Sequence, residues 1–230
     1  MRRGGLLRRL TRRLLRLGFW AAAAAVAWVA LYAVVPPPTT VLIEMERWRL
    51  GGVARDWRGL DAISPHLVRA AIAAEDARFC DHWGFDLKAI EAAVAERERG
   101  RVRGASTISQ QTAKNAFLWP APSWSRKGLE AGFTVLIEGL WSKRRVMEVY
   151  LNVAEFGPGV FGAEAAARHW FDRKAAELTL AQAARLAALL PSPRTRDAAR
   201  PSAFVAGRAR AIAGGAETIR AEGRDACVLG

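Results

Sequence analysis

The sequence predicts an all-α protein, with one helical domain preceded by a single apolar segment. Apolar residues recur at helical spacing through most of the chain, and helix-capping residues stand before several of these stretches. After residue 50 we find no run in which apolar and polar residues alternate as they would in a half-buried strand. Apolar residues make up 51% of the 230 positions, which is enough for a sizeable core.

The first 35 residues predict a membrane anchor. Residues 18–35 carry no charge, and about 20 apolar residues span a bilayer. Residues 1–16 contain seven arginines and no acid, which the positive-inside rule places in the cytoplasm. We expect a basic cytoplasmic tail (1–16), a transmembrane helix (17–35) and a linker (36–40). A cleaved signal peptide is the open alternative, although its apolar region usually has only about 7–15 residues.

The charge of the chain suits an anionic surface or ligand. The 35 basic and 22 acidic residues give +13, and without the seven N-terminal arginines the balance is 28 − 22, or +6. A moderately basic body fits a membrane surface or an anionic substrate. The sequence has no nucleic-acid-binding motif, so we expect no nucleic-acid partner.

The two cysteines, Cys80 and Cys227, lie far apart and fit no metal-binding spacing. We expect unpaired thiols rather than a bridge. Cys227 also falls in the C-terminal tail, residues 221–230, and such tails are often poorly ordered.

Residues 41–220 predict one helical domain that begins with a short extended segment, 41–50. Ser64 is the expected N-cap of the first helix, with Pro65 at its first position. Later helices are expected after Ser106, after Ser125 and directly from Ser142. Another runs from Thr179 to a stop at Pro191, and a last helix follows Ser202.

An acid lies on the apolar stripe of the first predicted helix. Its members recur at i, i+3, i+4, i+7 and i+11: Val68, Ala71, Ile72, Glu75 and Phe79. Burial disfavours the charged carboxylate, so the pKa of Glu75 should be raised above about 4.3. Such a group can act as a general base. A structural acid held by an arginine or a backbone amide is equally compatible with the spacing.

The helix after Ser106 carries a stripe of uncharged polar residues that ends in a cation. Thr107, Gln110, Gln111 and Lys114 recur at i, i+3, i+4 and i+7. Amides beside a lysine suit a ligand rich in hydroxyls and phosphate. An ordinary solvated face explains the spacing as well.

The next helix opens with two cations, Arg126 and Lys127, where the helix dipole disfavours them. They could serve a ligand, or Arg126 could pair with Glu130 four residues on. The preceding loop holds Phe117, Leu118, Trp119 and Trp124 around two prolines. It is expected either to fold over the core or to dip into a membrane interface.

Five segments together resemble the peptidoglycan glycosyltransferases, glycosyltransferase family 51. In order they are EDARFCDHWGFD, GASTISQQTAKN, RKGLE, KRRVMEVYLNVAEFGPGVFGAEAAARHWF and LTLAQAARLAALLPSP. The resemblance covers about residues 40–200, and the first two motifs together are highly specific. The chain is similar to the monofunctional, membrane-anchored members, which have no second domain. The resemblance implies a lysozyme-like helical fold and an enzyme on the outer face of the bacterial inner membrane.

The resemblance also implies a reaction, the polymerisation of lipid II, a disaccharide-peptide on undecaprenyl pyrophosphate. Glu75 matches the general base that deprotonates the acceptor's 4-hydroxyl, and the glycosidic linkage inverts as undecaprenyl pyrophosphate leaves. Glu130 matches the second essential glutamate, and Lys114 and Arg126 match residues that hold the pyrophosphate. The other expected substrate-binding positions are Asp76, Phe79, His82, Ser106, Thr107, Gln110, Gln111, Asn115 and Lys127. For His82 a structural role is the slightly favoured reading.

The expected partners are lipid II, the growing glycan chain, the membrane, and other cell-wall synthesis or division proteins. No cofactor is required, with Mg²⁺ or Mn²⁺ near the pyrophosphate as a possible addition. The chain departs from the family at Gln182, where a glutamate is usual, and at Pro122, where related members often carry an arginine. The first change concerns packing more than chemistry, and the second removes one expected pyrophosphate contact. Glu148 is expected to be structural.

Two rival functions fit parts of the pattern. A glycan hydrolase would use paired carboxylates, but Lys114 and Arg126 favour a pyrophosphate leaving group. A non-catalytic scaffold for the cell-wall machinery would have no use for Glu75 and Glu130.

Overall fold

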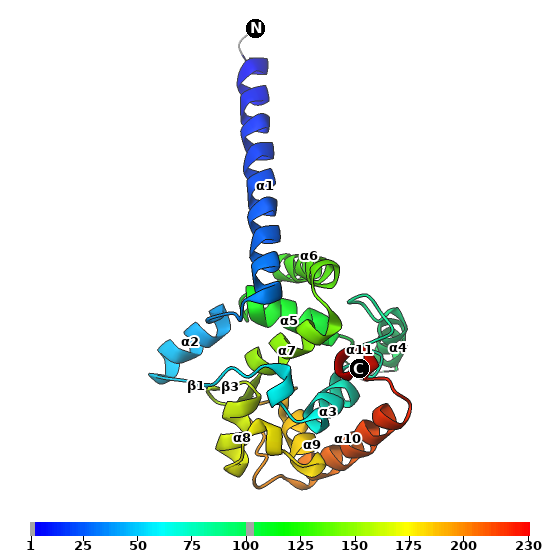
Figure 1. The fold of residues 1–230 in the computed structure, drawn as a ribbon. Helices are drawn as coiled ribbons and strands as arrows, with labels where there is room; N and C mark the ends of the chain where they lie inside the picture. Colours follow the sequence, from blue (N-terminus) through cyan, green and yellow to red (C-terminus); the bar gives the residue numbers. More distant parts are fainter. Residues whose placement is uncertain (1–2, 100–103) are drawn as a thin grey trace. The chain divides into compact units, whose positions relative to one another are not determined.

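The computed structural model describes residues 3–99 and 104–230, which form two compact units, residues 1–35 and 36–230 (Figure 1). The first two residues of the expected cytoplasmic tail lie outside the described residues. The first unit is the helix α1 (Arg3–Val34). Within it, the stretch Leu10–Val34 is long and apolar enough to cross a membrane. The predicted apolar helix before the domain is therefore confirmed.

The second unit is mostly helical, as predicted. Its α-helices are α2 (Val41–Leu50), α3 (Pro65–Glu75), α4 (Leu87–Glu98), α5 (Ile108–Phe117), α6 (Trp124–Leu140), α7 (Lys143–Val153), α8 (Ala163–Phe171), α9 (Leu180–Leu189), α10 (Ala203–Ala221) and α11 (Ala226–Leu229). Two short 3₁₀ helices, η1 (Leu60–Ala62) and η2 (Ala175–Glu177), complete the helical part. The sequence patterns did not single out α4 or α8.

Capping residues explain where these helices begin. Ser64 caps α3 with Pro65 at its first position, and Thr179 and Ser202 cap α9 and α10, as expected. Two expected caps were misplaced: Thr107 rather than Ser106 caps α5, and Ser123 rather than Ser125 caps α6. In each case the side-chain oxygen of the true cap accepts from the backbone N–H three residues on, which satisfies a free helix donor.

The expectation of an extended segment at residues 41–50 is wrong, because these residues form α2. The Thr40 side chain accepts from the N–H of Ile43 at 3.3 Å and caps the helix. Gly51 ends it with a φ of 74°, a left-handed conformation that glycine adopts without strain. The apolar residues of this segment had suggested a strand, but caps at both ends decide for a helix.

A small three-stranded sheet lies beside the helices, and the sequence patterns missed it. Its strands are β1 (Ala54–Arg55), β2 (Glu155–Gly157) and β3 (Val160–Phe161), in the order β1-β3-β2. β1 runs parallel to β3 and β2 runs antiparallel to it. Strands of two or three residues are too short for an alternating pattern to show.

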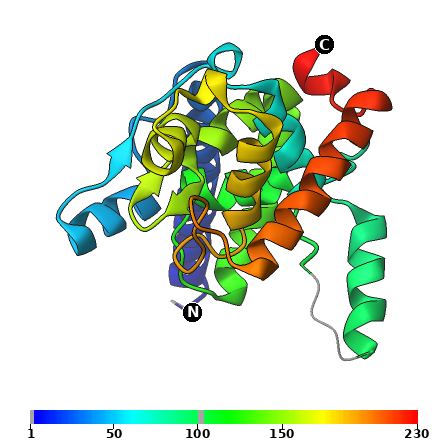
Figure 2. The same ribbon diagram turned by 90° about the horizontal axis from the view of Figure 1, so that it is seen from below.

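The core has two groups of packed helices. α3, α9 and α10 pack on one another, and Figure 2 shows α9 (gold) beside α10 (orange to red). α5 packs against both α6 and α7. The end of α3 and the first turns of α5 are joined by side-chain hydrogen bonds, and this junction carries the residues of the candidate site.

The expectation of unpaired cysteines is also wrong. Cys80 and Cys227 form a disulfide across 147 residues, with their Cα atoms 5.7 Å apart. The C-terminal tail is not loose, since it contains α11 and the buried Val228. Sequence spacing alone could not show that the fold brings the two sulfurs together.

Candidate active site

A cleft of about 890 Å³ is lined by residues of α3, α4, α5 and α10 and of the segments between them. Six of its lining residues carry polar or charged side chains relevant to the predicted site: Glu75, Asp76, Ser106, Thr107, Gln111 and Arg208. The cleft thus contains Glu75, the acid on the apolar stripe of α3.

Glu75, the last residue of α3, is largely buried, with 12% of its side chain exposed. Burial raises the pKa of this carboxyl, as predicted. Two contacts oppose that rise: Gln111 Nε2 donates to Oε2 at 2.8 Å, and Arg208 Nη2 lies 3.6 Å from Oε1. The group is therefore both desolvated and hydrogen-bonded in its ionised form, as a general base needs.

A buried tyrosine fixes the orientation of Gln111. The hydroxyl of Tyr150, on α7, donates to Gln111 Oε1 at 3.4 Å, which turns the amide nitrogen towards Glu75. Burial raises the pKa of Tyr150 well above its usual value, so the hydroxyl keeps its proton. Sequence patterns gave no reason to assign Tyr150 to the site, because it is one of several apolar or aromatic residues on α7.

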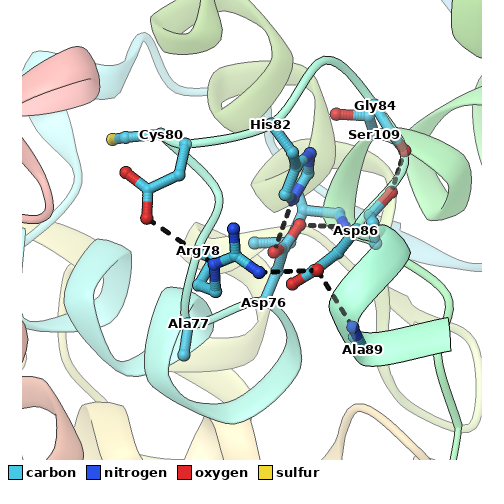
Figure 3. Close-up of polar contacts among 12 residues, drawn as sticks. Asp76, Ala77, Arg78, Cys80, His82, Gly84, Asp86, Ala89 and Ser109 are labelled. Atoms are coloured by element: carbon cyan, nitrogen blue, oxygen red, sulfur yellow. Dashed lines mark hydrogen bonds and ion pairs between the residues drawn. The ribbon is translucent and has the colours of Figure 1, made fainter. Parts of the chain in front are cut away.

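Asp76 joins the end of α3 to the start of α5. Its Oδ2 accepts from the backbone N–H of Ile108 at 3.0 Å, where the helix dipole favours a negative charge. Its Oδ1 lies 2.8 Å from Nε2 of His82 (Figure 3). Among the described residues, the buried Nδ1 of His82 has no hydrogen-bond partner. Both side chains are buried, so these contacts fit a role in shaping the site.

The polar stripe of α5 divides into two halves. Thr107 and Gln110 form a capping box, in which each side chain accepts from the other residue's backbone N–H. Thr107 also donates to the carbonyl of Gly84 at 2.7 Å. Of the second half, Gln111 donates to Glu75, and the ammonium of Lys114 interacts electrostatically with Glu130 and Glu75. The capping box explains the polar residues of the first half, although Thr107 also lines the cleft.

Three other predicted positions lie around α5 and the loop after α3. Ser106 is exposed at the cleft, whereas Asn115 and Phe79 are buried. The Phe79 ring packs under the Lys143 ammonium, with Nζ 4.5 Å from the ring centroid. These contacts place Phe79 in the support of the loop rather than at the open surface of the cleft.

A buried carboxylate surrounded by cations forms a second charged centre. Glu130 has 4% of its side chain exposed, and Arg126 Nη1 lies 2.6 Å from its Oε2. Lys127 donates to the other oxygen. The expected pairing of Arg126 with Glu130 is therefore present, and a second cation joins it.

Lys114 is an electrostatic neighbour of both acids. Burial lowers the pKa of its ammonium, and the carboxylates of Glu130 and Glu75 act in the opposite direction. Neither Lys114 nor Glu130 lines the 890 Å³ cleft itself, which contains Glu75 and Gln111. The described residues thus form two adjoining charged groups, one acidic at Glu75 and one with more cations than acids at Glu130.

Two arginines near Glu75 come from the C-terminal third of the chain and were not predicted. Arg208 lies on α10, and Arg196 lies in the segment between α9 and α10. Both stabilise the ionised form of Glu75 and so lower its pKa. Packing of α10 on α3 brings Arg208 there, and no local motif marks either arginine.

Asp76, His82 and Asp86 form a cluster that could hold a metal ion, with one ligand atom from each lying within 4.8 Å of the others. Both oxygens of Asp76 and Oδ1 of Asp86 already have hydrogen-bond partners in the protein. Asp86 Oδ1 accepts from Arg78 Nη1 and from the N–H of Ala89, both at 3.0 Å (Figure 3). A metal bound at Asp86 Oδ1 would compete with the Arg78 guanidinium, and we derive no step of the reaction through a metal.

The aromatic loop before α6 has a buried part and an exposed part. Phe117 and Leu118 are buried, and Phe117 stacks on Phe133 with ring centroids 4.9 Å apart. Trp124 is 92% exposed and Trp119 is 38% exposed. One side of the loop covers the core, and the other leaves indole rings free for an interface.

Two expectations about structural residues fit the contacts. Glu148 accepts from the backbone N–H of Leu60 at 3.0 Å and from Arg145. Gln182 accepts from the N–H of Thr179 in the capping box of α9. A glutamine fills this capping position as a glutamate would, so the departure leaves the helix start intact.

Comparison with known proteins gives a consistent result. Residues 44–216 match the Transglycosylase family. A biosynthetic peptidoglycan transglycosylase of Jannaschia sp. (strain CCS1) is 57% identical, over 98% of this chain and 93% of its own. One from Caulobacter vibrioides is 51% identical over 98% and 99%, and one from Pseudomonas putida (strain W619) is 54% identical over 89% of each chain. The chain therefore belongs to the peptidoglycan transglycosylase family, as its motifs predicted.

Proposed function

We propose that this protein polymerises lipid II into glycan strands, with Glu75 as the general base. The observation that carries the proposal is the state of Glu75 in the cleft. It is desolvated enough for its pKa to rise, yet hydrogen-bonded to Gln111 in the form that accepts a proton.

In the proposed reaction, Glu75 removes the proton of the acceptor's 4-hydroxyl. The oxygen attacks the anomeric carbon of the donor sugar, a new glycosidic bond forms, and the bond to pyrophosphate breaks. The pyrophosphate leaves with the electron pair, and the linkage changes from α to β. Such proton removal typically contributes about 10²–10⁴ in rate.

The cations around Glu130 suit the leaving group. Arg126, Lys127 and Lys114 carry three positive charges against one carboxylate, which leaves the cluster cationic. Preorganised cations of this kind stabilise charge that develops on a departing phosphate. Glu130 would then act mainly by holding Arg126 and Lys127 in place, because both of its oxygens are engaged by them.

The disulfide supports a body outside the cytoplasm. Disulfides form and persist in oxidising compartments such as the bacterial periplasm. The arginines before the apolar helix favour a cytoplasmic N-terminus. Together these features fit a single-pass inner-membrane protein with its catalytic domain on the periplasmic side, in reach of lipid II and the growing glycan. Other cell-wall synthesis or division proteins remain proposed partners.

The test is a gel assay in which the purified protein is incubated with labelled lipid II. Ladders of polymer are expected. Shortening of preformed glycan without polymer formation would indicate the rival hydrolase. A protein that changes neither substrate would be a scaffold, and the proposal would fail.

A further inference from the structure

The C-terminal segment, residues 222–230, is tied to the outer side of the loop that follows α3. We call residues 76–86 the site loop, because they include Asp76 and His82. Cys227 is bonded to Cys80 of this loop, and Arg224 Nη1 donates to the carbonyl of Ala77 at 3.3 Å. Two separate bonds therefore join the end of the chain to the loop beside Glu75.

The C-terminal segment is itself anchored to the body of the domain. Asp225 Oδ2 lies 2.6 Å from Arg69 Nε, on the same helix that ends at Glu75. Arg144 Nη1, on α7, donates to the carbonyl of Val228 at 2.9 Å. The segment therefore connects the site loop to α3 and α7.

The site loop needs such support, because it contains no regular helix or strand. On its inner side, Lys143 Nζ donates to the carbonyl of His82 at 2.8 Å. Figure 3 shows the Cys80 side chain pointing away from the Asp76–His82 pair. The loop is thus held from two sides, by Lys143 on the inside and by Cys227 and Arg224 on the outside.

We infer that the Cys80–Cys227 disulfide and Arg224 are positioning groups, which hold the site loop so that Asp76, the residue after Glu75, keeps its contacts with His82 and Ile108. This inference rests on the proposed transferase function of the site. Segments without regular structure open locally at low free-energy cost, and a crosslink restricts that opening. Displacement of site groups by about 1 Å can lower a rate by roughly 10².

The test uses the full-length protein in vesicles and the double variant Cys80→Ser/Cys227→Ser. We expect faster hydrogen exchange in residues 76–86 and a kcat more than about fivefold lower, with little change in KM for lipid II. Arg224→Gln should give a smaller change of the same kind. Reduction of the wild type by dithiothreitol, which yields two cysteine thiols and oxidised reagent, should reproduce the effect and leave the double variant unaltered.

Trp170→Phe is the matched control for loss of stability. It removes the hydrogen bond from Trp170 Nε1 to the carbonyl of Phe156, at the small sheet. It should lower Tm without faster exchange in the site loop and without the fall in kcat. A kcat within about fivefold of wild type in the double variant, or a fall in kcat matched by Trp170→Phe at equal loss of Tm, would overturn the inference.

The two proposals can fail separately. If the wild type does not polymerise lipid II, the proposed function fails, while hydrogen exchange still reports on the loop without substrate. If exchange in residues 76–86 is unchanged in the double variant, the positioning role fails even when the wild type is active.

Discussion

Gln111 Nε2 donates to Glu75 Oε2 across 2.8 Å, and this hydrogen bond joins α5 to the end of α3 inside the cleft. The bond favours the ionised form of Glu75, whereas burial favours the neutral form. Burial is the larger of the two effects, so the pKa of Glu75 is raised. The proposed base therefore has a pKa closer to neutrality than an exposed glutamate has, and its hydrogen-bond partner tunes that pKa.

Replacing Gln111 should shift the pH dependence of the reaction. The base must be ionised, so kcat/KM should rise with pH through the raised pKa of Glu75. Gln111→Leu removes a donor that lowers this pKa, so the acid limb of the profile should move to higher pH. Rates of polymerisation between about pH 4 and 8 would show the shift. An acid limb that stays in place, or moves to lower pH, would contradict the assignment of the base.

Replacing Lys114 should weaken catalysis. It should also remove the fall in rate at high pH that comes from deprotonation of this lysine. Burial lowers the pKa of Lys114, so its charge is lost at a lower pH than that of an ordinary lysine. Lys114→Gln should lower kcat by about 10²–10³ at neutral pH, the usual effect of losing one preorganised charge-stabilising group. Steady-state kinetics on lipid II measures this, with Lys174→Gln in the exposed turn before η2 as a control. Equal effects of the two substitutions would argue against a specific role for Lys114.

Gly84 is expected to be irreplaceable in the site loop. Its φ is 81°, and an added Cβ would lie 2.7 Å from Thr134 Cγ2 and 2.9 Å from Glu138 Cγ. Gly84→Ala should therefore destabilise the fold by about 2 kcal/mol or more and lower activity. Urea unfolding measures the loss. Gly132→Ala is the matched control, since nothing lies within 4 Å of its added Cβ and alanine suits the interior of α6. Similar stability of the two variants would show that the loop conformation is not as described.

Removing the apolar helix should leave the folding of the domain intact but reduce its access to lipid II in the membrane. Residues 36–230 form a compact unit of their own, so a protein lacking residues 1–35 should fold and be more soluble. It should act poorly on lipid II in vesicles, because the helix no longer brings the site to the membrane. Comparison of both proteins on the same liposomes tests this. Equal activity would show that the helix does not deliver the site to its substrate.

Local patterns predicted the parts of the site that lie within single helices. The apolar stripe of α3 placed Glu75 correctly at a buried position, and the spacing on α6 anticipated the contact of Arg126 with Glu130. The motif order also predicted the family. The burial of Glu75 and the contact of Arg126 with Glu130 follow from helical periodicity, which a sequence displays directly. The family followed instead from the resemblance of the ordered motifs.

Contacts between distant segments could not be predicted in the same way. Arg208 reaches Glu75 from α10, and Cys227 reaches Cys80 across 147 residues. Neither contact has a local spacing that marks it. Thr107 shows a different limit, because a polar residue at the start of a helix can either face a ligand or cap the helix, and here it caps. Only the packed structure distinguishes these roles.

The substitution Glu75→Gln shows whether Glu75 is the general base. The variant should fold, and at pH 7 its Tm should be at least that of the wild type. Because the pKa of Glu75 is raised in the folded protein, the free energy of unfolding of the wild type falls as the pH rises through that pKa. Glutamine does not ionise, so the variant does not lose this stability. In the labelled lipid II assay, we expect the folded variant to form polymer about 10²–10⁴ times more slowly than the wild type. A folded Glu75→Gln protein that polymerises lipid II at the wild-type rate would contradict this role for Glu75.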